Sequence, residues 1–170
     1  VKDGDVYGKT GEWAAQRYLD IGYDYGGENK CWITFENGAF TAAVGKENWP
    51  VVAVSWYGSK AFAAYSGFDL PTVAEWEYAA RGGKQLIYGT DDGSIDSTKV
   101  NYDMHVGCPT PVGAYPPNPF GLYDMSGNIW EWCRDWYGPY PDESVTNPAG
   151  ADSGDVRIIR DGTWDNKEFK

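Results

Sequence analysis

An alternation of acidic and aromatic residues in the C-terminal half of the chain has the clearest chemical meaning. Glu131 and Asp135 alternate with Trp130, Trp132 and Trp136, so an extended strand would place the acids on one face and the indoles on the other. We expect the aromatic face to be core. The acidic face would present Glu131 beside the carbonyls of the preceding Ser-Gly-Asn turn, and calcium prefers carboxylate, amide and carbonyl oxygens. The pattern therefore indicates a calcium site; the alternative is that Glu131 accepts hydrogen bonds from main-chain groups.

Other reactive side chains do not form a recognisable catalytic set. Cys31, Cys108 and Cys133 are too few and too widely spaced for a zinc cluster, and their odd number allows at most one internal disulfide. His105 is the only histidine, so it cannot anchor a metal triad that needs a second imidazole. Ser126 lacks the outer glycine of a nucleophile elbow. Serine hydrolysis and zinc chemistry are therefore disfavoured.

Two short helices are expected in the middle of the chain. Ser55 offers an N-cap hydroxyl to a helix over residues 56–65, which Gly67 closes. Thr72 and Glu75 have the spacing of a capping box, and the helix that follows them ends at an Arg-Gly-Gly sequence. Glu75 is therefore interpreted as a capping residue rather than as a catalytic acid.

Short strands separated by turns are expected elsewhere. The Asn-Gly pair at residues 37–38 predicts a hairpin between residues 31–35 and 39–41, because both turn residues tolerate a positive φ. Further expected elements are a helix within residues 8–19 and strands near residues 50–54, 111–115, 129–135 and 156–160. The predicted fold class is α+β, irregular and rich in loops, with the two helices packed on small antiparallel sheets.

Composition narrows the range of partners. With 170 residues, of which 42% are hydrophobic, the chain can form one core, and we expect a single domain over residues 1–170. The net charge of -11 would repel phosphate backbones, so nucleic acid is excluded as a partner. No apolar run approaches the ~20 residues that a membrane span needs, and Val1 follows no leader sequence. A protein or a small molecule is the expected partner; the oligomeric state is open.

Four ordered blocks of sequence resemble the signature blocks of the sulfatase-modifying-factor (formylglycine-generating-enzyme) family. They lie at residues 50–67, 70–83, 111–137 and 157–166, and the similarity covers roughly residues 28–166. The resemblance implies a C-type-lectin-like fold with bound calcium. The family contains enzymes that oxidise a sulfatase cysteine to formylglycine with oxygen and copper. It also contains iron-dependent sulfoxide synthases, variable ligand-binding proteins and surface lipoproteins.

The resemblance carries two calcium sites over to this chain. The first falls on Gly127, Asn128, Ile129 and Glu131, with Gly127 and Ile129 acting through their carbonyls. The second would use Asn101 and Tyr102, and the shorter loop that follows leaves only Asp103 as its acidic ligand.

The cysteine pair of the family's enzymes has no counterpart here. That pair binds copper and follows the block matched by residues 161–164, yet residues 165–170 contain no cysteine. We therefore expect a non-catalytic, calcium-stabilised module that binds a ligand through Trp164, Asp165 and Asn166. The alternative is a C-terminally truncated formylglycine-generating oxidoreductase whose cysteines, and hence copper, lie beyond the end of this sequence. A secreted, periplasmic or cell-surface location is expected.

Overall fold

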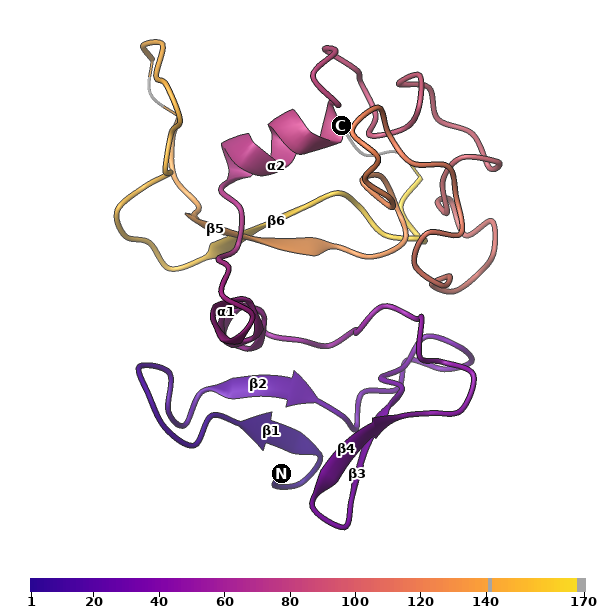
Figure 1. The fold of residues 1–170 in the computed structure, drawn as a ribbon, viewed down its shortest axis with the longest axis vertical. Helices are drawn as coiled ribbons and strands as arrows, with labels where there is room; N and C mark the ends of the chain where they lie inside the picture. Colours follow the sequence, from indigo (N-terminus) through magenta and orange to yellow (C-terminus); the bar gives the residue numbers. More distant parts are fainter. Residues whose placement is uncertain (141, 168–170) are drawn as a thin grey trace.

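The computed structural model describes residues 1–140 and 142–167. Its helices and strands form an α+β fold with two helices and three two-stranded antiparallel sheets, as predicted (Figure 1). In chain order the elements are β1 (Asp5–Tyr7), β2 (Arg17–Asp20), β3 (Ile33–Glu36), β4 (Ala39–Ala42), α1 (Trp56–Tyr65), α2 (Val73–Ala80), β5 (Glu131–Trp136) and β6 (Arg157–Arg160). Figure 1 shows β1 to β4 at one end of the molecule, α2 with the β5–β6 pair at the other, and α1 between them.

The first sheet replaces the helix predicted within residues 8–19, and that prediction was wrong. β1 and β2 pair with Val6 opposite Leu19, and the chain reverses between them. Gly11 and Ala15 have φ values of 88° and 65°, which a continuous right-handed helix does not allow. The packing of β2 on α1 stabilises the observed structure more than the modest helix propensity of residues 8–19 would stabilise a helix.

The predicted hairpin and both helix starts are confirmed. Asn37 and Gly38 adopt φ values of 52° and 82° at the turn between β3 and β4. Ser55 Oγ accepts a hydrogen bond from the amide of Gly58 at 3.1 Å, at the start of α1. At the start of α2, Thr72 Oγ1 accepts from the amide of Glu75 at 3.1 Å, and the Glu75 carboxylate accepts from the amide of Thr72 at 2.7 Å.

Two of the predicted strands do not form. Residues 50–54 make a single bridge, from Val54 to Leu19, and Ala53, whose φ is 58°, interrupts them. Residues 111–115 form a turn, in which the amide of Ala114 donates to the carbonyl of Pro111. The predicted strands near residues 129–135 and 156–160 are confirmed as β5 and β6.

β5 runs through the core, but its more deeply buried face is not the predicted one. Cys133 is 0% exposed and Asp135 5%, whereas Trp130, just before the strand, is 52% exposed. The carbonyl of Cys133 accepts a hydrogen bond from the indole of Trp56 in α1, and the Asp135 carboxylate accepts one from the amide of Val73 in α2. Because both helices pack on this face of the strand, the acidic face is buried in the core and the aromatic face is partly exposed.

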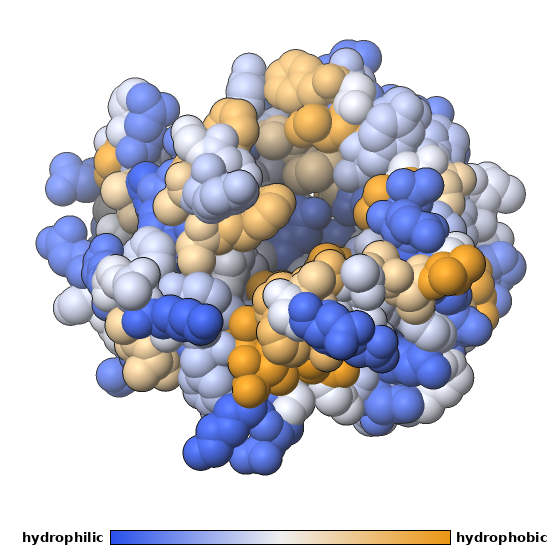
Figure 2. Space-filling view, turned by 60° about the horizontal axis from the view of Figure 1, so that its bottom comes forward, coloured by the Kyte–Doolittle hydropathy of each residue, from blue (hydrophilic) through white to orange (hydrophobic). Residues whose placement is uncertain are grey.

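The surface of the molecule is uneven. Figure 2 shows a hollow in the middle of one face, with hydrophobic residues along its rim. Neither of the described helices, which are 10 and 8 residues long, has the length and apolar character of a membrane span.

Candidate functional site

A buried turn just before β5, which we name the Gly127 corner (residues 126–129), is the centre of the candidate site. Gly127 and Asn128 have φ values of 80° and 67°, so the backbone is left-handed at two successive positions. A Cβ atom on Gly127 would lie 2.6 Å from Cγ1 of Val100 and closer still to the carbonyl of Asn101. Only glycine fits this approach without displacing its neighbours.

The corner brings distant predicted residues together. The amide of Asn128 donates to the carbonyl of Asn101 at 2.9 Å, and the amide of Trp164 donates to the carbonyl of Asn128 at 3.0 Å. The Asn128 side chain is occupied by the main chain of Thr110, to which it donates at 3.2 Å and from which it accepts at 2.9 Å. The Asn101 side chain donates to the carbonyl of Cys108, and its Oδ1 is buried with no hydrogen-bond partner among the described residues.

Glu131 lies beside the corner in a partly enclosed, acidic environment. Its Oε2 accepts a hydrogen bond from the indole of Trp76 at 2.6 Å. Burial raises the pKa of the Glu131 carboxyl, the Trp76 hydrogen bond lowers it in part, and the charge of Asp124 raises it further. Burial likewise raises the pKa of Asp124, whose carboxylate accepts from the amide of Gly113 at 2.7 Å. A cavity of about 220 Å³ lies against Asp124, Glu131 and residues 127–129.

Asp161 is a residue of the site to which the sequence pattern assigned no role. It follows β6, has a φ of 81°, and accepts the amide of Gly127 on Oδ1 at 2.6 Å. Its Oδ2 is enclosed and has no hydrogen-bond partner among the described residues. Burial raises the pKa of the Asp161 carboxyl well above its usual range, and the charges of Glu131 and Asp124 raise it further. The signal in the sequence was an acid in a block that resembles Gly-Gly-Ser-Trp.

The donor atoms around the corner suit calcium in kind. Carboxylates of Glu131 and Asp124, main-chain carbonyls of the corner and the unpartnered amide oxygen of Asn101 are all hard oxygen ligands. Within residues 1–140 and 142–167, no group of three or more His, Cys, Asp or Glu side chains is arranged to hold a metal ion. An ion at this place would therefore depend on carbonyl and amide oxygens as well as on carboxylates. Of the other predicted ligands, Tyr102 is half-buried and Asp103 is exposed.

The three residues predicted to contact a ligand, Trp164, Asp165 and Asn166, do not all line one surface. Trp164 is only 8% exposed, and together with the exposed Asp165 it lines a groove of about 470 Å³. Asn166 instead fixes the loop, since its Oδ1 accepts from the amide of Thr163 at 3.0 Å and its carbonyl accepts from the amide of Asp103 at 2.8 Å. Aromatic and aliphatic residues form most of the groove, which is lined by Tyr23, Tyr25, Asn29, Val51, Val52, Ala53, Val54, Ile129, Trp130, Trp132, Ile159, Thr163, Trp164 and Asp165.

The three cysteines, all within the described residues, are free thiols in protected environments. Cys31 and Cys133 are buried and Cys108 is half-buried. Burial raises the pKa of all three thiols, and together with the nearby Asp135 it raises that of Cys133 to about 12. Since the thiolate is the nucleophile and the metal ligand, these residues are poorly suited to either role at neutral pH.

Comparisons with known proteins agree on one family. The model of the sulfatase-modifying factor enzyme 1-like domain matches residues 8–169. The chain is 37% identical over 144 residues to the formylglycine-generating enzyme of Streptomyces coelicolor, a match that covers 75% of this chain and 46% of that enzyme. It is 39% identical over 136 residues to serine/threonine-protein kinase pkn1 of Chlamydia pneumoniae, covering 78% of this chain and 22% of the kinase. This chain therefore spans less than half the length of either relative.

A solved structure supports the same fold. PvdO from Pseudomonas aeruginosa superposes with a TM-score of 0.62 and 26% sequence identity, covering 85% of this chain and 59% of that one. The C-type-lectin-like character of the fold stays a prediction.

Proposed function

The chain belongs to the sulfatase-modifying-factor family, and we propose that within this family it acts as a non-catalytic binding or assembly module whose loops are held in place by calcium. The observation that carries the proposal is the Gly127 corner. There, burial raises the pKa of the Asp124, Glu131 and Asp161 carboxyls, and the amide oxygen of Asn101 is buried without a hydrogen-bond donor from the described residues. Groups of this kind are stabilised by a hard cation.

The residues proposed to hold calcium belong to two adjoining sets. The carbonyls of Gly127 and Ile129, the amide group of Asn128 and the carboxylate of Glu131 form the first set, in which the Asn128 side chain would have to exchange a hydrogen bond to Thr110 for the ion. The second set is Asn101 and Tyr102. When bound, calcium supplies positive charge that offsets the enclosed acids. By binding the same ion, Glu131 and Asn101 would fix the position of β5 relative to the loop of residues 101–110.

The groove beside Trp164 and Asp165 is the proposed binding surface. Its aromatic walls offer rigid contact area to a protein segment or a small molecule. We propose a secreted, periplasmic or cell-surface location, where weak calcium sites are occupied because extracellular modules work at calcium dissociation constants of about 10⁻⁴ to 10⁻³ M.

Chelation of calcium is expected to lower the melting temperature. At a free calcium concentration about 100 times the dissociation constant, binding contributes about 2.7 kcal/mol to the free energy of unfolding, which corresponds to several degrees. Differential scanning calorimetry with and without EDTA measures the shift. Glu131→Gln should retain the Trp76 hydrogen bond but lose most of the shift, whereas the exposed Glu143→Gln should keep all of it. An EDTA-insensitive melt of the native chain would remove calcium from the proposal.

No aldehyde is expected when the chain is incubated with a sulfatase-type cysteine peptide, copper and oxygen. The reason is that Cys31, Cys108 and Cys133 all have raised thiol pKa values, so none offers a ready thiolate to copper or substrate. Mass spectrometry of the peptide detects the conversion, and the Streptomyces coelicolor enzyme serves as the positive control. Aldehyde formation by this chain would show that it is an enzyme and overturn the non-catalytic proposal.

A further inference from the structure

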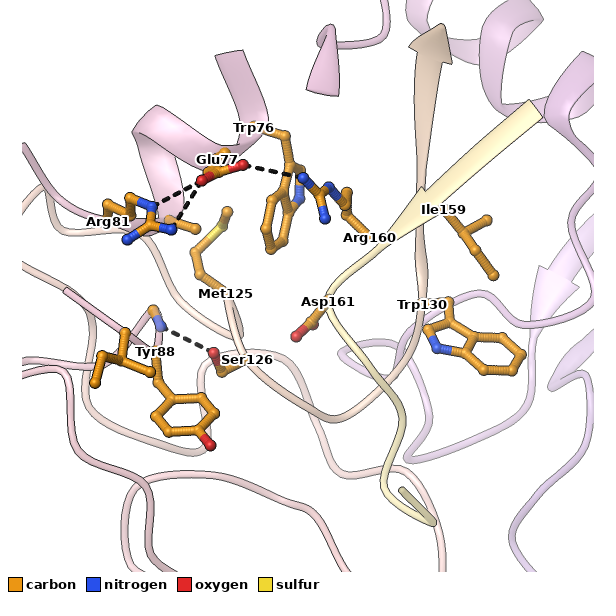
Figure 3. Close-up of a pocket in the computed structure, with 13 residues that line it drawn as sticks. Trp76, Glu77, Arg81, Tyr88, Met125, Ser126, Trp130, Ile159, Arg160 and Asp161 are labelled. Atoms are coloured by element: carbon orange, nitrogen blue, oxygen red, sulfur yellow. Dashed lines mark hydrogen bonds and ion pairs between the residues drawn. The ribbon is translucent and has the colours of Figure 1, made fainter. Parts of the chain in front are cut away.

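A second cavity, which shares Trp130 and Ile159 with the groove at Trp164, lies between α2 and the end of β6 (Figure 3). Its volume is about 220 Å³, which is roughly the space of seven water molecules at ~30 Å³ each. Neither the proposed calcium ligands nor the ligand-contacting loop line it. The residues around it are Trp76, Glu77, Ala80, Arg81, Ile87, Tyr88, Gly89, Met125, Ser126, Trp130, Ile159, Arg160 and Asp161.

The positive charge of this cavity comes from Arg81, at the C-terminal end of α2, and from Arg160, the last residue of β6. Glu77 forms ion pairs with Arg81 at 2.8 Å and with Arg160 at 3.0 Å, so two guanidinium groups share one carboxylate. One positive charge is therefore left uncompensated within this triad. Nε of Arg160 is enclosed and has no hydrogen-bond partner among the described residues.

The acidic group of the cavity is Asp161, and a bound cation would offset the burial that raises the pKa of its carboxyl. Figure 3 shows its carboxyl directed into the cavity, away from the pair of Glu77 and Arg160. Oδ1 is held by the amide of Gly127, whereas Oδ2 is enclosed with no partner among the described residues. The backbone of Asp161 has a φ of 81°, in the left-handed region that aspartate and asparagine adopt more often than other residues with a Cβ atom.

The walls between the two charges are apolar. Trp76 and Met125 lie on one side, and Trp130 and Ile159 on the other, with Trp130 about half exposed at the mouth. A ligand therefore meets a donor-rich region, an acceptor and an apolar surface within one small space. This combination of groups complements a molecule that carries both charges and an apolar side chain.

We propose that this cavity binds a free apolar amino acid. Its ammonium group donates to Oδ2 of Asp161, its carboxylate accepts from Arg160 or Arg81, and its side chain lies against Trp76 and Trp130. An amine without a carboxylate leaves the guanidinium end unmatched, and a carboxylic acid without an amine leaves Asp161 unmatched. Water molecules bridging the same atoms are the competing explanation.

Calorimetric titration in calcium-containing buffer with three probes tests the proposal. L-Leucine is expected to bind, whereas 3-methylbutylamine and 4-methylpentanoate, which each carry one of its two charged groups, should bind at least tenfold more weakly. The expected ratio follows from the loss of a charge-assisted hydrogen bond, which changes affinity by about ten- to a hundredfold. No heat from L-leucine, or equal affinity for all three probes, would overturn the proposal in favour of water.

Variants assign the binding to this cavity. Asp161→Asn keeps an acceptor for the Gly127 amide but loses the charge, and should weaken L-leucine binding at least tenfold; the exposed Asp152→Asn should not change it. Trp130→Ala changes a half-exposed residue that also lines the groove at Trp164, so it tests the apolar wall rather than the location of the site, and it should weaken binding severalfold without unfolding the chain. Retained affinity in Asp161→Asn and Trp130→Ala would overturn the proposal. So would binding of L-leucine that is seen in EDTA but lost in calcium-containing buffer, because that result would assign Asp161 to the ion. Failure to bind L-leucine would not change the expected effect of EDTA on the melting temperature.

Discussion

Replacing Asp135 with alanine is expected to lower the free energy of unfolding by about 2–4 kcal/mol. Asp135 is 5% exposed, and its Oδ2 accepts the amide of Val73 at 2.9 Å, in the first turn of α2. Alanine would leave that amide without its acceptor and would remove a negative charge from the positive end of the helix. It would also open a space next to Gly150, where a Cβ atom would lie only 2.6 Å from the Asp135 carboxylate. Urea denaturation of the native and variant chains measures the change.

Two further variants separate the causes of this loss. Asp135→Asn retains an acceptor for the Val73 amide and should lose less stability than the alanine variant. Asp152→Ala removes an exposed carboxylate and should stay within about 0.5 kcal/mol of the native chain. Equal losses in Asp135→Ala and Asp152→Ala would mean that the contact between β5 and α2 contributes little to stability.

The contacts of Asp135 are of a kind that sequence patterns do not predict, whereas the start of α2 is predictable. The capping box joins Thr72 and Glu75, three positions apart, and these residue types alone predict the start of α2 correctly. The hydrogen bond between the Asp135 carboxylate and the Val73 amide joins residues 62 positions apart, and the sequence near either residue does not predict it. The alternation of acidic and aromatic residues predicts the strand β5 correctly. Which face of that strand is buried depends on the helices that pack on it, so the prediction that the aromatic face is core was wrong.

Local signals also failed where tertiary pairing decided the structure. Residues 8–19 have a weak helical composition, yet β2 pairs with β1, which lies just before this segment, and packs against α1, which lies far outside any short window of sequence. Residues 50–54 are β-branched enough to suggest a strand. There, the carbonyl of Val54 accepts a hydrogen bond from the indole of Trp132 instead of joining a ladder.

The candidate site was accessible from the sequence only in part. The resemblance to the family drew attention to Gly127, Asn128 and Glu131, and the structure places these residues with Asn101 around one corner. Asp161 was overlooked because its interest lies in its φ, its enclosure and its unpartnered oxygen, and none of these properties is visible in residue type. The only sign of it in the sequence is an acid in a block that resembles Gly-Gly-Ser-Trp.

The backbone of the Gly127 corner makes the sharpest test of the site. Gly127→Ala is expected to lower the free energy of unfolding by about 3 kcal/mol or more, because two penalties act at once. A left-handed φ of 80° costs a residue with a Cβ roughly 1–2 kcal/mol, and the new methyl group would also overlap Val100 and the carbonyl of Asn101. The clash would push Asn101 away from Asn128, so the EDTA-dependent part of the melting temperature should fall as well.

Gly121→Ala is the matched control for this variant. Gly121 has nearly the same φ, 78°, but a Cβ atom there meets nothing within 4 Å. It should therefore show the conformational penalty alone, about 1–2 kcal/mol, and keep the full response to EDTA. The difference between the two variants in urea denaturation isolates the contact between the corner and Asn101. If both variants lose the same stability, that contact does not hold the site together, and the ligands proposed for calcium would have to be positioned by the strand that follows the corner.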